Sequence, residues 1–237
     1  TGIVDHRALQ SPIKSQGGRG TCSAFATVAG VEALNKRKGQ PWGDFSENDA
    51  FNGALTLTGG HCTQSGGVHT WATTQVALTG VCPEAAFPYT PQCPAASIPQ
   101  ACQVAPHAKL DHVFMMQTPA HLVPGLPNDA AHRADNVALL ESWIHSGADI
   151  IYAVDVAGND WNNGDLNTAV VDVQVDSQGH PAPAYGAHAI LMVGYDHNAK
   201  YFIFKNSWGT GLGHNGYIYL SYDYVQTYAW YGFVIID

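Results

Sequence analysis

Two apolar stretches that flank one short polar turn constrain the fold of this chain more than any other feature. The first runs from Ala187 to Tyr195, the second from Tyr201 to Lys205, and the turn Asp196–Lys200 joins them. Short aliphatic and aromatic stretches around a few polar residues predict an antiparallel β-hairpin. Paired positions in a hairpin are equidistant from its turn. His188 and Asn206, whose midpoint 197 falls in the turn, are therefore expected nearly opposite each other.

Helical patterns occupy the first half of the chain. Apolar residues at three-to-four spacing predict a helix from Cys22 to Lys38, with Thr21 as its N-cap and Gly39 as its stop. Shorter helices are expected over Val68–Leu78 and, further along, over Asn136–His145. These helices place most of the helical content before residue 150.

From Asp149 onward the chain is strand-like. Strands are expected at 150–156, 170–175, 189–195, 201–205, 216–222 and 231–236, and long loops at 118–128 and 159–185. Helices followed by strands predict an α+β fold with two subdomains.

Composition excludes several classes of protein and partner. Hydrophobic residues make up 46% and charged residues 12% of the 237 residues, so the chain has ample apolar surface to fold. The net charge of −9 disfavours nucleic acid and anionic membranes as partners. No apolar run approaches the roughly 20 residues of a spanning helix, and the first residues lack the apolar core of a signal peptide. We expect no nucleic-acid partner and no membrane attachment.

The cysteines divide into one isolated residue and a group of four. Cys22 stands apart, whereas Cys62, Cys82, Cys93 and Cys102 lie close together in sequence. This odd count predicts two disulfides among the four and one free thiol, in a secreted or lysosome-like compartment, with all three connectivities open. The chain has no C-x-x-C or H-E-x-x-H motif and its 12 histidines are scattered, so we expect no metal and no cofactor.

Cys22 is the first candidate for chemistry. It follows the Gly-rich segment Gln16–Thr21 and opens the predicted helix, where free N–H groups and the helix dipole favour a thiolate. The competing interpretation is a buried structural cysteine. The second candidate is His188: an amide such as Asn206 beside it can accept its N–H and fix the ring, although a histidine in an apolar strand can also be a core residue.

These segments resemble those of the papain-like cysteine peptidases. The matching blocks are Gln16 to Cys22, H-A-I-L-M-V-G-Y from His188, and K-N-S-W-G-T-G-L-G-H-N-G-Y-I from Lys205. The resemblance implies an α+β, papain-like fold with the active-site cleft between a helical subdomain and an antiparallel, β-barrel-like subdomain. The helical subdomain is expected at 8–108, and the β subdomain at 1–7 and 109–237.

The resemblance also implies a role for each matched residue. Cys22 is the expected nucleophile, His188 its acid/base partner, Asn206 the residue that orients the imidazole, and Gln16 an oxyanion donor. Trp208 is expected to shield the bond between His188 and Asn206. The residues expected to bind substrate are Gly66, Gly67, Val68, His69, Gly186, Ala189 and Trp208.

Three positions depart from the family pattern. Arg19 stands where the family usually has a disulfide-bonded cysteine, Ser23 where it usually has Trp, and Ala187 where an acidic or amide residue often precedes the histidine. We expect the thiolate of Cys22 to form well below the free-thiol pKa, either with help from Arg19 or with Arg19 pointing into solvent.

The function that follows is hydrolysis of peptide bonds through a thiolate–imidazolium pair and an acyl-enzyme. The expected partners are peptide or protein substrates and an inhibitory pro-segment removed on maturation, and the chain is expected to be a monomer. Two alternatives are a catalytically silent peptide-binding module and a Cys-His-Asn acyltransferase. Gly211–Gly216 matches the dinucleotide fingerprint G-x-G-x-x-G, but it leads into a predicted strand, which excludes that fingerprint.

Overall fold

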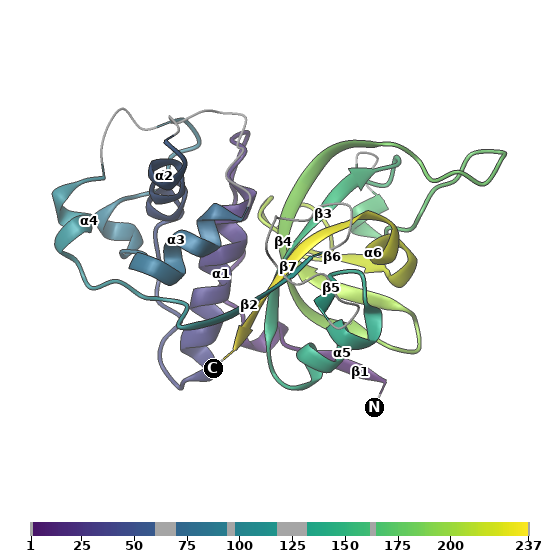
Figure 1. Cartoon of the computed structure of the whole chain (residues 1–237), viewed down its shortest axis with the longest axis horizontal. Helices are drawn as coiled ribbons and strands as arrows, with labels where there is room; N and C mark the ends of the chain where they lie inside the picture. The colour runs from purple at the N-terminus through teal and green to yellow at the C-terminus, as the bar shows by residue number, and fades with distance from the viewer. Residues whose placement is uncertain (1, 60–69, 94–97, 118–131, 162–164, 237) are drawn as a thin grey trace.

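The helices of the first half and the strands of the second half lie on opposite sides of the molecule (Figure 1). The computed structural model describes residues 2–59, 70–93, 98–117, 132–161 and 165–236. The helices are α1 (Cys22–Arg37), α2 (Glu47–Thr58), α3 (Trp71–Thr79), α4 (Gln100–Val104), α5 (Val137–His145) and α6 (Tyr222–Tyr228). The strands are β1 (Ile3–Asp5), β2 (His112–Gln117), β3 (Asp149–Ala157), β4 (Ala184–Asp196), β5 (Tyr201–Lys205), β6 (Tyr217–Ser221) and β7 (Ala229–Ile236).

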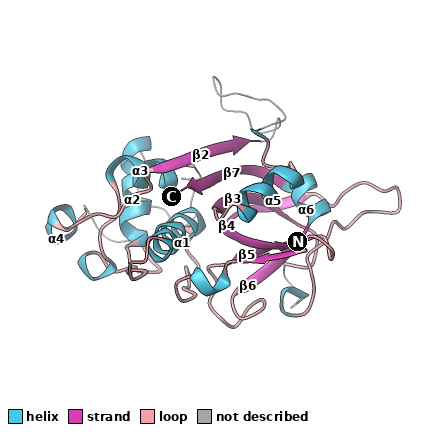
Figure 2. Ribbon diagram, turned by 90° about the horizontal axis from the view of Figure 1, so that it is seen from below, coloured by secondary structure: helices cyan, strands magenta, loops and turns pink. Residues whose placement is uncertain are grey.

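All seven strands belong to one antiparallel sheet. Its order is β2-β7-β3-β4-β5-β6, with β1 paired to β4, and Figure 2 shows this order from β2 to β6. The α+β class is confirmed, but the sheet is open and does not close into the expected barrel. A closed barrel fills its interior with strand side chains. Here Leu140 and Ile144 of α5 and Tyr224 and Val225 of α6 pack into the core on one face of the sheet.

The central strand β3 is buried on both faces. Ile150, Tyr152 and Val154 point into the core shared with α5 and α6. Ile151 and Ala153 point the other way, into the core shared with α1, α2 and α3. This alternation follows the two-residue period of a strand, and it makes the sheet the wall between two apolar layers.

Helix α1 lies directly against the sheet. Val28 and Val31 are fully buried in the same core as Ile151. Gly30 permits this approach, because a Cβ at that position would collide with the Cδ1 atom of Ile235 on β7. The helix thus holds its first residue, Cys22, at the boundary between the helices and the sheet.

The predicted elements are confirmed where their patterns were strong. The expected helices at 22–38 and 136–145 are α1 and α5. The expected helix at 68–78 is α3, whose described part begins at Trp71; residues 68 and 69 lie outside the described residues. Helix α2 was missed, although the sequence contains a signal for its start: Ser46 is followed three residues later by the acidic Asp49. In the structure Ser46 is the N-cap, and its Oγ accepts the N–H of Asp49 at 3.0 Å.

Two expectations about the strands are wrong. The strand expected at 170–175 is replaced by isolated bridges from Val171 to Leu220 and from Val175 to Pro181. The hairpin of β4 and β5 forms, but Asp196 pairs with Tyr201, which centres the turn between residues 198 and 199 instead of at 197. After a one-residue register shift between Met192 and Gly194, Leu191 faces Lys205. The strand pairing therefore does not place His188 opposite Asn206. The segment 211–216 does lead into a strand, β6, and the dinucleotide interpretation stays excluded.

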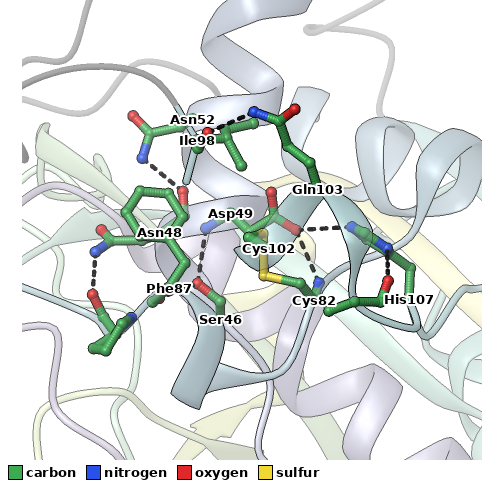
Figure 3. The surroundings of a disulfide bond; sticks show 12 residues. Ser46, Asn48, Asp49, Asn52, Cys82, Phe87, Ile98, Cys102, Gln103 and His107 are labelled. Atoms are coloured by element: carbon green, nitrogen blue, oxygen red, sulfur yellow. Dashed lines mark hydrogen bonds and ion pairs between the residues drawn. A yellow bond between two sulfur atoms is a disulfide. The ribbon is translucent and has the colours of Figure 1, made fainter. Parts of the chain in front are cut away.

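A disulfide joins Cys82 to Cys102 and ties α4 to the rest of the helical layer (Figure 3). The buried carboxylate of Asp49, on α2, accepts the N–H of Cys82 at 2.9 Å and lies 3.8 Å from Nε2 of His107. Cys93 is also disulfide-bonded, and Cys22 is a free thiol. The predicted involvement of Cys62 falls outside the described residues.

Candidate active site

Cys22 stands at the start of α1, where the sequence predicts it. Thr21 occupies the N-cap position, but its side chain makes no capping hydrogen bond to the helix. The main-chain N–H groups of Cys22, Ser23 and Ala189 point toward the thiol and favour its anion. Ala189 belongs to β4 and follows His188, so the free thiol faces the strand that carries the histidine.

Burial has the larger effect on this thiol. It raises the pKa of Cys22 above the ordinary value, and the three N–H groups offset only part of the increase. The expectation of a thiolate well below the free-thiol pKa is therefore wrong for the free protein. The sequence could not show that Cys22, partly buried at the end of the helix, packs against the core shared with the sheet.

His188 and Asn206 meet through their side chains. Nε2 of His188 lies 2.8 Å from Oδ1 of Asn206, and both residues are buried. The same Oδ1 accepts the main-chain N–H of Ser207 at 2.8 Å. A main-chain N–H can only donate, so the atom it contacts is the amide oxygen. His188 consequently carries its hydrogen on Nε2, and Nδ1 is the basic nitrogen.

Aromatic rings enclose this pair. The ring of Trp208 stacks on that of His188, with the ring centroids 4.5 Å apart and 24° between the ring planes, so an apolar ring covers one face of the imidazole. Trp161 approaches edge-on, 6.1 Å from His188 and 5.9 Å from Trp208. Its Nε1 donates to the hydroxyl of Tyr224 at 2.8 Å. The part played by Trp208 was expected, whereas Trp161 and Tyr224 were missed because nothing in sequence links them to His188.

The enclosure has an electrostatic consequence. Burial lowers the pKa of His188 to about 4, and the bond to Asn206 opposes this only in part. Burial also raises the pKa of Cys22, so it opposes the charged form of each of the two groups when that group is charged alone.

Gln16 lies beside the segment that follows Asn206. Its Oε1 accepts the hydroxyl of Ser207 at 2.6 Å, and its main-chain N–H donates to the carbonyl of Ser207 at 2.8 Å. Its Nε2 donates one hydrogen to the carbonyl of Arg19 at 2.8 Å. An amide nitrogen carries two hydrogens, so Gln16 retains a second donor. Ser207 thus contacts both the amide of Gln16 and the amide of Asn206.

The residues expected to bind substrate are only partly described. Gly66, Gly67, Val68 and His69 lie outside the described residues. Gly186 is exposed on β4, with open space where a Cβ would stand. Ala189 is buried on the face toward Cys22. The structure therefore brings Gly186, Ala189 and Trp208 to the surroundings of His188 and leaves the other four as predictions.

A group of charged residues beside Asn206, most of them buried, was not predicted. Nζ of Lys14 lies 2.9 Å from Glu32, 2.8 Å from Asp44 and 2.9 Å from Glu47. Nζ of Lys205 donates to the carbonyl and the hydroxyl of Ser11, at 2.9 and 2.7 Å. These two lysines, Glu32, Glu47 and Asn206 line a cavity of about 20 Å³, enough for one water molecule. The cluster joins the helical layer to the base of the site.

Among the residues that the structure describes, one group of potential metal ligands comes together: Asp49, Cys82 and Cys102. Its two sulfur atoms form the disulfide, so they are not available as thiolates. Within the same described ranges, no helix is both long and apolar enough to cross a membrane.

A comparison with family models decides the relationship. Residues 3–231 match the model of the papain family cysteine proteases. The chain belongs to the papain family. The resemblance seen in the sequence is thereby confirmed, and the match extends over nearly all of the chain.

Known relatives agree with this membership. Papaya proteinase 4 of Carica papaya is 28% identical over 225 residues, which cover 91% of this chain and 54% of that protein. Among solved structures, xylellain of Xylella fastidiosa has a TM-score of 0.78 at 22% identity, covering 99% of this chain and 85% of its own. The proform of the ragweed protease Amb a 11 has a TM-score of 0.72 at 21% identity, covering 100% and 67%. This papain-family chain spans about half the length of the curated relatives it matches.

Proposed function

We propose that this chain hydrolyses peptide bonds, with Cys22 as nucleophile and His188 as its acid/base partner. The observation that carries the proposal is the fixed tautomer of His188. Asn206 holds Nε2–H at 2.8 Å, which leaves Nδ1 as the nitrogen that can take a proton from Cys22.

The reactive charges form together rather than one at a time. Burial penalises a lone thiolate at Cys22 and a lone imidazolium at His188. Transfer of the proton from Sγ to Nδ1 creates both charges side by side, and each stabilises the other in the same desolvated site. The N–H groups of Cys22, Ser23 and Ala189 add to the stabilisation of the thiolate.

The thiolate attacks the carbonyl carbon of the scissile bond, and the carbonyl oxygen becomes an oxyanion. The second hydrogen on Nε2 of Gln16 and the main-chain N–H of Cys22 stabilise it. As the C–N bond breaks, His188 gives its proton to the leaving amine, and an acyl-enzyme remains on Sγ. His188 then takes a proton from water, whose oxygen displaces Sγ and releases the acid product.

The substrate lies between two subdomains, residues 8–108 and residues 1–7 with 109–237. Gly66 and Gly67 bind its main chain, and Val68, His69, Gly186, Ala189 and Trp208 surround its side chains. The protein is a secreted or lysosome-like monomer whose inhibitory pro-segment is removed on maturation. The support for these points is membership of the papain family and, for the pro-segment, the proform known for Amb a 11.

The test compares the wild-type protein with Cys22→Ala on a mixed peptide library, with and without an added primary amine. We expect wild type to release free carboxylic acids and Cys22→Ala to release none, while its far- and near-UV circular dichroism stays that of wild type. Activity of Cys22→Ala above a tenth of wild type would overturn the assignment. Products that carry the amine in preference to water would identify a transferase, and intact peptides with wild type would identify a silent module.

A further inference from the structure

The loop that carries Gln16 and leads to Cys22 is fastened by one tyrosine. The hydroxyl of Tyr89 donates to the main-chain carbonyl of Gln16 at 2.7 Å. Its single hydrogen is used there, so the hydroxyl of Thr21, 2.8 Å away, donates to it. Tyr89 therefore contacts the loop at both of its ends, Gln16 and Thr21. Its ring packs against the ring of Phe25 on α1 in a T-shaped arrangement, with the ring centroids 4.8 Å apart.

Arg19, in the middle of the same loop, is fastened to α2. Its side chain is 1% exposed, and Nη1 donates to Oδ1 of Asn48 at 2.7 Å and to the carbonyl of Thr90 at 3.2 Å. The guanidinium lies over the rings of Phe51, at 4.7 Å, and Tyr89, at 5.9 Å. The expectation that Arg19 points into solvent is therefore wrong, whereas its expected effect on the Cys22 thiolate stays a prediction.

These contacts of Tyr89 and Arg19 affect the side-chain amide of Gln16 through the main chain of the loop. The carbonyl of Arg19 accepts Nε2–H of Gln16 at 2.8 Å. The position of that carbonyl fixes the direction of the amide, and hence of its second hydrogen. A displacement of the order of 1 Å in such a donor is enough to cost a large factor in rate.

We propose that Tyr89 and Arg19 are positioning residues for the oxyanion donor Gln16, and that they hold its loop by hydrogen bonds and ring contacts. This inference rests on the proposed function. Neither residue touches the substrate. Their effect passes through the place and direction of the Gln16 amide.

The test is a double-mutant cycle between Tyr89→Phe and Gln16→Ala, with the loop followed by hydrogen exchange. Tyr89→Phe keeps the ring against Phe25 and Arg19 and removes only the hydroxyl. We expect kcat to fall about tenfold with KM within twofold, and amides 16–22 to exchange at least tenfold faster. In the Gln16→Ala background, the same substitution is expected to change kcat less than twofold.

The matched control is Tyr152→Phe, which also loses a buried hydroxyl bonded to a main-chain carbonyl, that of Ala134 at 3.2 Å. Its kcat and the exchange of amides 16–22 are expected to equal those of wild type. Arg19→Met should accelerate exchange like Tyr89→Phe, and Arg19→Lys should recover part of the protection.

Unchanged exchange in Tyr89→Phe would overturn the proposal, as would a fall in kcat of the same size in both backgrounds. If wild type hydrolyses no peptide, the proposed function fails, and the exchange rates still decide whether Tyr89 and Arg19 hold the loop.

Discussion

Nε2 of His188 lies 2.8 Å from Oδ1 of Asn206, and the main chain determines which of these atoms carries the hydrogen. The N–H of Ser207 occupies the same oxygen at 2.8 Å, so the amide cannot turn without placing two donors together. The tautomer of His188 is therefore a property of the fold. Removing the amide should leave a buried imidazole N–H without an acceptor and free the ring to turn.

Asn206→Ala is expected to lower kcat/KM by about ten- to a hundredfold, because His188 loses the group that fixes its orientation. The measurement is steady-state hydrolysis of a fluorogenic peptide. Asn198→Ala, an exposed position in the turn of the same hairpin, serves as the control and should match wild type. A value for Asn206→Ala within threefold of wild type would contradict the role given to Asn206.

Gln16→Ala should reduce kcat by ~10²–10³ with little change in KM, because an oxyanion donor acts in the transition state. Gln178→Ala, in an exposed loop, provides the comparison. An increase confined to KM would make Gln16 a substrate-binding residue instead.

The sequence predicted the residues of the candidate site better than the strand pairing that positions them. Cys22, His188 and Asn206 lie in local patterns that can be read directly: Cys22 opens α1 as predicted, and the side chains of His188 and Asn206 meet. The reason given for the meeting of His188 and Asn206 was wrong, because the pairing of Asp196 with Tyr201 centres the hairpin between residues 198 and 199. The two residues are therefore not opposite each other in the ladder, and only their side chains meet. Where the hairpin turns depends on how the whole strands pair, which the polar segment 196–200 alone does not show.

The failures concern burial and long-range contacts. The direction of the pKa shift of Cys22 follows from burial, which depends on segments remote in sequence. The anchor of Arg19 depends on Asn48 and Tyr89, which belong to distant segments. The caps of α2 at Ser46 and of α6 at Ser221, a helix that was also missed, were local signals that could have been used.

Arg19→Met, which removes the positive charge and keeps most of the length of the side chain, should leave the pH dependence of Cys22 alkylation unchanged. The guanidinium is held over Phe51 and bonded to Asn48, and the influences on the pKa of Cys22 are burial and three main-chain N–H groups. The rate of iodoacetamide labelling across pH 5–10 is the measurement, with wild type as reference. A displaced midpoint would restore the electrostatic role that the sequence suggested for Arg19.

Alkylation of the unfolded, unreduced protein should modify one cysteine, Cys22. Replacing Cys82 and Cys102 together by alanine should lower the free energy of unfolding by about 2–4 kcal/mol, since their disulfide closes a loop with a sequence separation of 20. Urea unfolding measures this, with reduced wild type as a second reference. Three or more labelled cysteines in the unreduced protein would contradict the disulfide framework.

Glu47→Gln should change how stability depends on pH. The carboxyl of Glu47 is 2% exposed and shares the single ammonium of Lys14 with Glu32 and Asp44. Burial outweighs the attraction of Lys14 and raises the pKa of Glu47 to about 7, from an ordinary 4.5. Between these values the unfolded chain releases this proton and the folded chain keeps it. Wild type therefore loses stability from this group as pH rises from 4.5 to 7, by roughly 3 kcal/mol, and none further above 7.

Glutamine has no proton to release, so the unfolding free energy of Glu47→Gln minus that of wild type should grow by up to that amount over the same range. Urea titrations at pH 4.5, 6.0 and 7.5 measure the difference, and Asp111→Asn at an exposed position is the control. A constant difference across the three pH values would show that Glu47 is ionised throughout and fully paired with Lys14.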